Sequence, residues 1–383
     1  MNGCCERDMI EIGERAPDFV LPSRGVPTRF YGIAGGRPVA LVFCGPESLD
    51  LVSRYADWAG PDAAVVAVTS GGGDGERAFP VLVDGAGAVQ AMFLGEGDES
   101  ARLVLLDPNL RVVGVRALEG APPDELRGAA ARHADERAVE VSGQAPVLLI
   151  PGALDLETCA RLVHVLETRG SVETGVERTR EGRREDGLDP DAKRRRDHTV
   201  EDPELLRSLT VAVGRRVMPE VRKAFAFRAT RFEGFKIACY DATEGGYFRA
   251  HRDNLSPSTE HRRFALTLNL NEGYAGGHLR FPEYGAYLYR PGAGGAVVFS
   301  GSHLHEALPV TRGKRYMLPL LPVRRGRSPL WQLSGGIRPG LYAGGGCRCS
   351  SSKFRVGGCA GYQPAEKREP EAASGIPAGV SVD

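Results

Sequence analysis

Tyr247-Phe248-Arg249-Ala250-His251-Arg252-Asp253 is the stretch that decides the fold of the second half of this chain. It lies in a region, from residue 232 to Pro322, of short apolar runs separated by turn residues, a pattern typical of a β-sandwich or jelly roll. In an extended strand, residues i and i+2 point to the same side, so His251 and Asp253 share a face and Arg252 points away. An imidazole and a carboxylate on one face are candidate ligands for a single metal ion.

A second His-x-Asp sequence, His133-Ala134-Asp135, gives a useful comparison. This copy lies in a segment with helical spacing, where residues i and i+2 diverge by about 200° and cannot hold one ion together. The pair in the strand-like region is therefore the one to pursue.

A third ligand is expected downstream, because two histidines and one carboxylate form a triad that leaves three positions on an iron ion open. The segment from His303 to Tyr316 offers two candidates, His303 and His305. Both share one face of an expected strand, so alternation alone does not choose between them.

Together these motifs resemble the 2-oxoglutarate- and Fe(II)-dependent dioxygenases of the prolyl 4-hydroxylase type. In that family the third ligand opens an H-x3-P-V motif, and a basic residue ten positions later binds the cosubstrate. His305 opens such a motif, and Arg315 follows ten residues later. The resemblance therefore implies a metal centre of His251, Asp253 and His305, with His303 as the fallback ligand, and a cosubstrate site at Arg315.

Other segments match the family in order and spacing, and the resemblance covers residues 145–323. Phe235–Tyr240 is similar to the strand before the metal motif, and Tyr240 matches a tyrosine that hydrogen-bonds the cosubstrate. Arg263–Asn271 and Gly276–Pro282 are similar to two further strands. The implied fold is a double-stranded β-helix, or jelly roll, with flanking helices.

The resemblance also implies the chemistry. Fe(II), 2-oxoglutarate and O2 are the expected cofactor and cosubstrates, with ascorbate as a further candidate. The expected reaction hydroxylates an aliphatic carbon, with a prolyl residue of a peptide or protein as the first candidate, and releases succinate and CO2. No catalytic side chain is expected beyond the metal centre. The substrate, peptide, protein or small molecule, stays open.

The first half of the chain has a different pattern. Val39–Phe43, Ala63–Thr69, Pro80–Val83 and Arg102–Asp107 are predicted strands, and helical spacing appears at Leu49–Trp58. Strands that alternate with helices favour an α/β layer fold.

Gly13–Phe19, FPVLVDGAGAVQ (79–90) and LVLLDPNLRVVG (103–114) resemble peroxiredoxins and other thioredoxin-like proteins. The resemblance implies a thioredoxin-like domain over residues 1–140. The resemblance to peroxiredoxins fails at the expected active site, because no threonine and peroxidatic cysteine follow the strand that ends at Phe43. Cys44 comes too early for a helix N-terminus that would lower a thiol pKa, so a buried structural cysteine is expected.

Two rival functions follow from this half. Cys44 could make the chain a thiol peroxidase or redox partner, and an inert jelly roll could make it a non-enzymatic binding module.

Three other segments carry expectations. Asp155 is a predicted N-cap for a helix with an apolar face at Leu156, Cys159, Leu162, Val163 and Leu166, and a second helix is predicted over Asp202–Phe227. The charged residues 171–203 predict a solvated loop, with an active-site lid or a basic substrate patch as the alternative. Arg324–Asp383 is predicted to be a disordered tail, and its cysteines lack a fourth zinc ligand.

Composition narrows the function classes. Lys plus Arg equals Asp plus Glu at 49 each, so the net charge is zero and favours neither a nucleic acid partner nor an anionic membrane. The longest apolar run is too short for a membrane span, and the N-terminus is too charged for a signal peptide. We therefore expect a cytoplasmic protein whose eight cysteines are free thiols.

Overall fold

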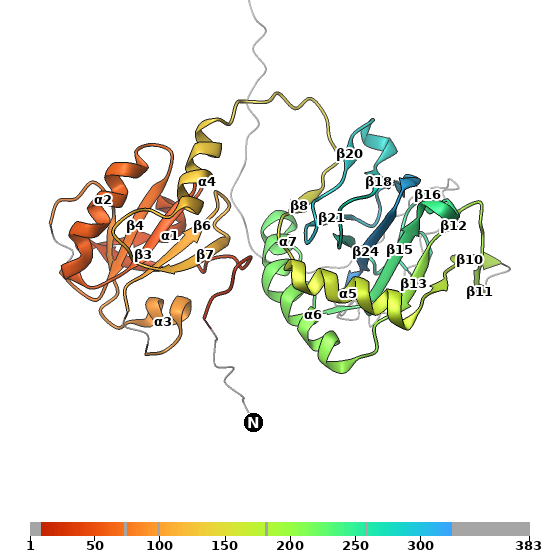
Figure 1. Cartoon of the computed structure of the whole chain (residues 1–383), viewed down its shortest axis with the longest axis horizontal. Coiled ribbons are helices and arrows are strands. Elements are labelled where there is room, and N and C mark those ends of the chain that lie inside the picture. Colours follow the sequence, from red (N-terminus) through yellow and green to blue (C-terminus); the bar gives the residue numbers. More distant parts are fainter. Residues whose placement is uncertain (1–8, 73–74, 98–99, 181–182, 257–258, 324–383) are drawn as a thin grey trace, which may run out of the picture. The chain divides into compact units, whose positions relative to one another are not determined.

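The structure, a computed structural model, describes residues 9–323 apart from 73–74, 98–99, 181–182 and 257–258 (Figure 1). The predicted tail Arg324–Asp383 and its cysteines lie outside the described residues. Among the helices of the described part, none combines the length and the apolar character needed to cross a bilayer.

The first half contains a five-stranded sheet of order β5-β4-β3-β6-β7. Its strands are β3 (Val39–Phe43), β4 (Ala64–Thr69), β5 (Val81–Val83), β6 (Arg102–Leu106) and β7 (Val112–Ala117). β3, β4 and β5 run parallel, whereas β6 and β7 are antiparallel additions. The predicted strands are confirmed to within one residue at each end.

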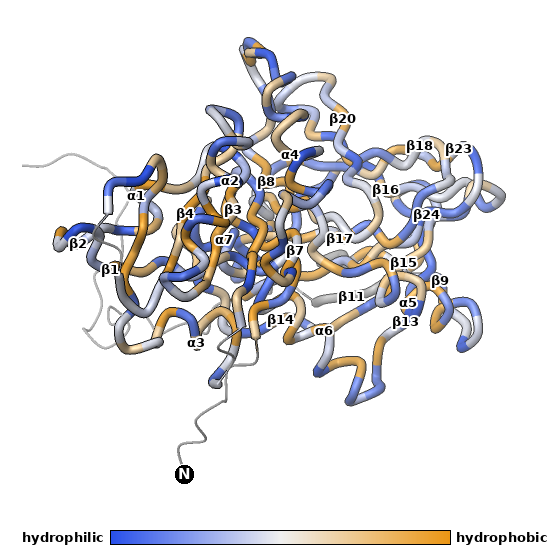
Figure 2. The backbone as a smooth tube through the Cα atoms, turned by 60° about the vertical axis from the view of Figure 1, so that its left-hand side comes forward, coloured by the Kyte–Doolittle hydropathy of each residue, from blue (hydrophilic) through white to orange (hydrophobic). Residues whose placement is uncertain are grey.

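Helices cover both faces of this sheet. They are α1 (Phe30–Ile33), α2 (Leu49–Ala59), α3 (Ala88–Leu94) and α4 (Asp124–Ala134), and a hairpin of β1 (Val20–Ser23) and β2 (Val26–Arg29) precedes them. Alternate residues of β3 enter different clusters: Val39, Leu41 and Phe43 pack with α1 and α3, and Ala40 and Val42 with α2 and α4. Burial on both faces explains why all of β3, and all of β4 except Thr69, is hydrophobic (Figure 2).

The second half contains two antiparallel sheets. The larger has the order β8-β21-β17-β24-β15-β13-β9 and the smaller β12-β16-β22-β19-β20. The strands of the larger sheet are β8 (Leu148–Ile150), β9 (Val172–Glu173), β13 (Arg196–Thr199), β15 (Lys236–Asp241), β17 (Phe264–Asn269), β21 (Ala296–Ser300) and β24 (Lys314–Leu320). Those of the smaller are β12 (Lys193–Arg194), β16 (Tyr247–His251), β19 (Leu279–Arg280), β20 (Leu288–Tyr289) and β22 (His305–Ala307). Pairs outside these sheets are β10 (Val176–Arg180) with β11 (Arg183–Gly187), β14 (Arg231–Phe232) with β25 (Pro322–Val323), and β18 (Ala275–Gly276) with β23 (Val310–Arg312).

Strand alternation divides β15 between two environments. Ile237 and Cys239 pack against the helices α5 (Leu156–Arg169), α6 (Pro203–Arg216) and α7 (Met218–Phe225). Ala238 and Tyr240 point the other way and share a cluster with Ala307 of the smaller sheet. Two sheets around a shared core, with helices on the outside of one, are consistent with a jelly roll, and Tyr240 faces its interior.

Two helix predictions need correction. The predicted helix Asp202–Phe227 is two helices, α6 and α7, that meet at Val217. Pro219 explains the break, because proline lacks the N–H that would continue the first helix. Asp155 does cap α5, accepting a hydrogen bond from the Thr158 N–H at 2.6 Å, but Leu156 is 67% exposed and the buried stripe begins one turn later.

The predicted loop 171–203 is wrong as well. β9, β12 and β13 extend both sheets from this segment, and β10 pairs with β11. Lys193 and Asp197 are buried although charged, so the hydrophobic pattern gave no strand signal there.

Candidate metal centre

Three predicted ligands lie together. His251, Asp253 and His305 each offer one ligand atom, and these atoms lie within 4.8 Å of one another. The Asp253 carboxylate is 3.5 Å from Nε2 of His251 and 3.7 Å from Nε2 of His305. His251 on β16 is directly opposite His305 on β22, so the pairing of the two strands creates the cluster.

Both imidazoles have a defined proton position. Nδ1 of His251 is 2.8 Å from the Arg249 carbonyl oxygen, and Nδ1 of His305 is 2.9 Å from that of His303. A carbonyl can only accept, so each Nδ1 must carry a proton, and in the neutral ring the free lone pair is then on Nε2. The atoms that face Asp253 are therefore the ones able to bind a metal.

The charges of the cluster suit a cation. Burial lowers the pKa of His305 to about 4, so its ring is neutral near pH 7. Burial alone would raise the pKa of Asp253, but the combined electrostatic effect of the neighbouring His251, His305 and Arg262 side chains outweighs it, and the pKa lies below its ordinary value. Two imidazole nitrogens and one carboxylate oxygen on one side suit Fe(II) and leave its other side open.

Aromatic rings hold the imidazoles in place. The His251 ring stacks on Phe248 with centroids 3.7 Å apart, and the His305 ring lies 4.6 Å from Phe299. The two histidine rings are 4.3 Å apart. Packing thus restricts rotation of the ligand side chains before any ion binds.

Neither alternative histidine joins the cluster. His303 has its Nδ1 3.2 Å from the Tyr284 hydroxyl, and it contributes its backbone carbonyl, not its ring, to the centre. His133 lies on α4 beside Glu136, as its helical spacing predicted.

Glu283, which the sequence did not single out, connects the two ligand segments. Its carboxylate accepts two hydrogen bonds from Arg252, at 2.6 and 3.1 Å, and one from the Leu304 N–H at 2.9 Å. Arg252 lies between His251 and Asp253, and it also donates to the Ser302 carbonyl. The Glu283 carboxylate therefore links Arg252, which lies between two metal ligands, to Leu304, the residue just before the third ligand.

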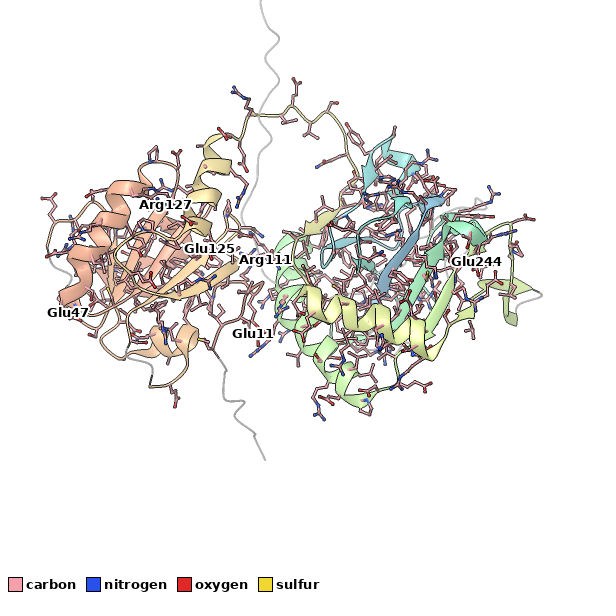
Figure 3. All side chains as sticks on the ribbon, viewed as in Figure 1. Glu11, Glu47, Arg111, Glu125, Arg127 and Glu244 are labelled. Carbon is pink, nitrogen blue, oxygen red and sulfur yellow. The ribbon has the colours of Figure 1, made fainter. Side chains whose placement is uncertain are left out.

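We expect Glu283→Gln to weaken Fe(II) binding about tenfold, the lower end of the usual cost of losing a residue that orients metal ligands. Glutamine keeps the size but has one acceptor oxygen for three donors. An anaerobic Fe(II) titration of the full chain measures this. Glu125→Gln is the matched control, because Glu125 also pairs with an arginine on an exposed surface, far along the chain on α4 (Figure 3). Equal affinity in both variants would contradict the link.

Arg315 and Tyr240 lie opposite each other on β24 and β15. Arg315 is 3% exposed, its guanidinium is 5.8 Å from the Tyr240 ring centroid, and its Nε has no hydrogen-bond partner among the described residues. Lys314 points to the other face and lies 3.6 Å from Asp241. A buried guanidinium with an unused N–H is costly, so this position suits an anionic ligand.

Gly277 makes room for Arg315. It has φ +65°, and a Cβ there would lie 2.9 Å from Cγ2 of Val310 and 3.1 Å from Cδ of Arg315. Glycine is thus required both by the backbone and by the arginine stem.

These side chains line one cavity of about 710 Å³. The metal cluster, Tyr240 and Arg315 all contribute to its wall, together with Arg195 from the segment between β12 and β13. The cavity thus holds three metal donors and, among the described residues, a guanidinium with an unused N–H. These groups fit Fe(II) and a dicarboxylate that binds the ion at one end and Arg315 at the other. The basic patch considered for residues 171–203 did not single out Arg195, and the pairing of β13 with β15 is what places it at this cavity.

Comparison with known proteins agrees with this site. The family model described as the 2OG-Fe(II) oxygenase superfamily matches residues 235–320. PKHD-type hydroxylases of Pseudomonas putida strains F1 and KT2440 are 31% and 30% identical over 187 and 186 residues, each match covering 44% of this chain and 75% of the relative. The crystal structure of a P. putida prolyl-4-hydroxylase is 20% identical, with a TM-score of 0.36, over 48% of this chain and 95% of that one.

The matched segment contains the metal cluster, Tyr240 and Arg315. The protein is a 2-oxoglutarate-dependent dioxygenase that uses Fe(II), 2-oxoglutarate and O2. Because the chain is 31% identical to a PKHD-type hydroxylase over 75% of that protein's length, and the family model matches the same region, the chain belongs to the 2OG-Fe(II) oxygenase superfamily.

Proposed function

We propose that this dioxygenase hydroxylates an aliphatic carbon of a peptide or protein, with a prolyl residue as the first candidate, and releases succinate and CO2. The single observation that carries the proposal is the cavity, whose lining extends beyond the metal cluster and includes Val176, Ala192, Leu255 and Leu321. Its volume lies in the range of sites for ligands much larger than 2-oxoglutarate. The relatives named as hydroxylases support the same reaction.

The roles we propose for the residues follow from their positions. When bound, Fe(II) supplies the oxidising chemistry that couples decarboxylation of 2-oxoglutarate to substrate hydroxylation. His251, Asp253 and His305 hold one side of the ion and leave the other to ligands. Arg315 neutralises the far carboxylate of 2-oxoglutarate, and Tyr240 adds a hydrogen bond to it. The surrounding apolar walls exclude water.

Succinate release by the Fe(II)-loaded chain, with ascorbate in the buffer, tests the substrate class. The panel contains proline-containing peptides, the same peptides with alanine in place of proline, and free amino acids. We expect succinate formation to rise above the uncoupled rate with the proline peptides alone. Stimulation by free amino acids only would contradict a peptide or protein substrate.

We also propose that residues 1–140 form a thioredoxin-like domain without peroxidase activity, joined to a dioxygenase domain over residues 145–323. The sheet order β5-β4-β3-β6-β7, in which β5, β4 and β3 pair in parallel and β6 and β7 are added by antiparallel pairing, supports the first part. The role of this N-terminal domain would be to act as a scaffold or to recognise a partner.

Cys44 supports the absence of peroxidase activity. The side chain is 7% exposed, and burial raises the pKa of its thiol to about 11. Roughly one thiol in ten thousand is then ionised at pH 7, and the thiolate is the form that attacks peroxide. We expect the metal-free chain to consume hydrogen peroxide no faster than its Cys44→Ser variant. Rapid consumption that Cys44→Ser abolishes would instead favour the redox function.

A further inference from the structure

A pair of buried charged residues adjoins the cosubstrate side of the cavity. Arg195 donates from Nε and Nη2 to the two oxygens of Asp197, each at 2.7 Å. The side chains are 13% and 2% exposed. Thr174 donates to the same carboxylate at 3.0 Å, so Asp197 is well satisfied and balances the charge of Arg195.

Strand register places Arg195 beside Tyr240. β13 pairs with β15 so that Arg196 is opposite Cys239 and Asp197 opposite Ala238. The next position along brings Arg195 opposite Tyr240, and Tyr240 in turn is opposite Arg315. Residues directly opposite on adjacent strands project to the same side of a sheet. Arg195, just before β13, therefore forms one row with Tyr240 on β15 and Arg315 on β24, and all three line the cavity.

The chemistry of this row determines whether the Tyr240 hydroxyl donates or accepts a hydrogen bond on each side. The Arg195 guanidinium is the neighbour of the Tyr240 side chain in this row and is the hydrogen-bond donor available to its hydroxyl. A guanidinium has donors only, so Tyr240 must be the acceptor and keeps its own proton to donate. Arg315 on the other side has no acceptor to offer, and among the described residues no side chain or carbonyl accepts this proton. The hydroxyl proton is thus available to an anion that enters between Tyr240 and Arg315.

We propose that Arg195 is a positioning residue of the 2-oxoglutarate site, which acts by holding Tyr240 as a hydrogen-bond donor to the far carboxylate. Arg195 does not serve as a second free cation, because Asp197 already occupies two of its donors. The inference rests on the proposed roles of Arg315 and Tyr240.

The test compares two ligands of the Mn(II)-loaded full chain by calorimetry without O2. 2-Oxoglutarate binds the metal and presents a far carboxylate, whereas oxalate can bind the metal but has no far carboxylate. Loss of one hydrogen bond to a charged group costs about tenfold or more in affinity. We expect Arg195→Met and Tyr240→Phe each to weaken 2-oxoglutarate binding about tenfold and to leave oxalate binding unchanged.

Two further variants separate this role from a merely structural one. The double variant Arg195→Met/Tyr240→Phe should bind 2-oxoglutarate as Tyr240→Phe does, because Arg195 acts through the hydroxyl. Arg195→Lys, also a pure donor, should recover most of the affinity. Since Arg195→Met leaves a buried carboxylate unpaired, Arg195→Met/Asp197→Leu removes both charges and should show the same selective loss, with thermal unfolding as the folding control.

The outcomes are distinguishable. Unchanged 2-oxoglutarate affinity in Arg195→Met, or an equal loss for both ligands, overturns the inference while the proposed function stands. Additive losses in the double variant overturn it as well. If the wild-type chain binds no 2-oxoglutarate, or binds it equally well after Arg315→Ala, the proposed site and this inference both fall.

Discussion

His305→Ala is expected to abolish Fe(II) binding and turnover. The variant removes one of two imidazoles whose Nε2 atoms face Asp253, and two donors alone hold a divalent ion poorly. His251→Ala and Asp253→Ala should have the same effect for the same reason. An anaerobic Fe(II) titration followed by succinate release measures both properties.

His303→Ala is the matched control for this prediction. His303 is two residues from His305, but its ring lies against Tyr284 and outside the cluster. We expect it to keep Fe(II) binding, since its contribution to the centre is a backbone carbonyl that alanine retains. Loss of iron in His303→Ala together with full activity in His305→Ala would show that the wrong histidine has been assigned.

Arg315→Ala should keep Fe(II) but lose 2-oxoglutarate. The far carboxylate of 2-oxoglutarate enters a buried position, where an unpaired charge is costly. Removing one partner of a buried charged pair costs about 3–5 kcal/mol, or a factor of a few hundred or more in affinity. Arg315→Lys should be intermediate, because lysine keeps the charge without the two-pronged geometry.

The adjacent Lys314 supplies the control. It lies on the same strand, is exposed and pairs with Asp241, so Lys314→Ala should bind 2-oxoglutarate normally. A titration of the Fe(II)-loaded chain, read from the charge-transfer absorbance, distinguishes the two. A large loss in Lys314→Ala with none in Arg315→Ala would mean that the register of β24 is misassigned.

The parts of the site that the sequence predicted depend on local geometry. The common face of His251 and Asp253, and the opposite faces of Lys314 and Arg315, follow from a period of two along a single strand. The choice of His305 over His303 came from the family motif, because both share a face. The strands of the first half were predictable because each is a continuous apolar run.

The parts that were missed depend on pairings between distant segments. Arg195 and Asp197 are charged residues in a charged stretch, and nothing local says that β13 pairs with β15 and buries them. Glu283 lies in a short 3-10 helix (Pro282–Tyr284), and its role arises only because Arg252 and Leu304, distant in the sequence, hydrogen-bond to it. The division of the second helix could have been predicted, since Pro219 interrupts it.

The length of the connection from His305 to Arg315 limits the insertions and deletions that this chain can tolerate. A Cβ on Gly276 would lie 2.3 Å from the Pro309 carbonyl oxygen, so the backbone of this connection is held closely against its neighbour. A deletion or insertion of a single residue there would exchange the inward and outward faces of β24 and bring a neighbour of Arg315 to the cavity in its place. Substitutions in the connection can accumulate, whereas a change of its length by one residue would remove the cosubstrate cation even though every residue of the site remained encoded.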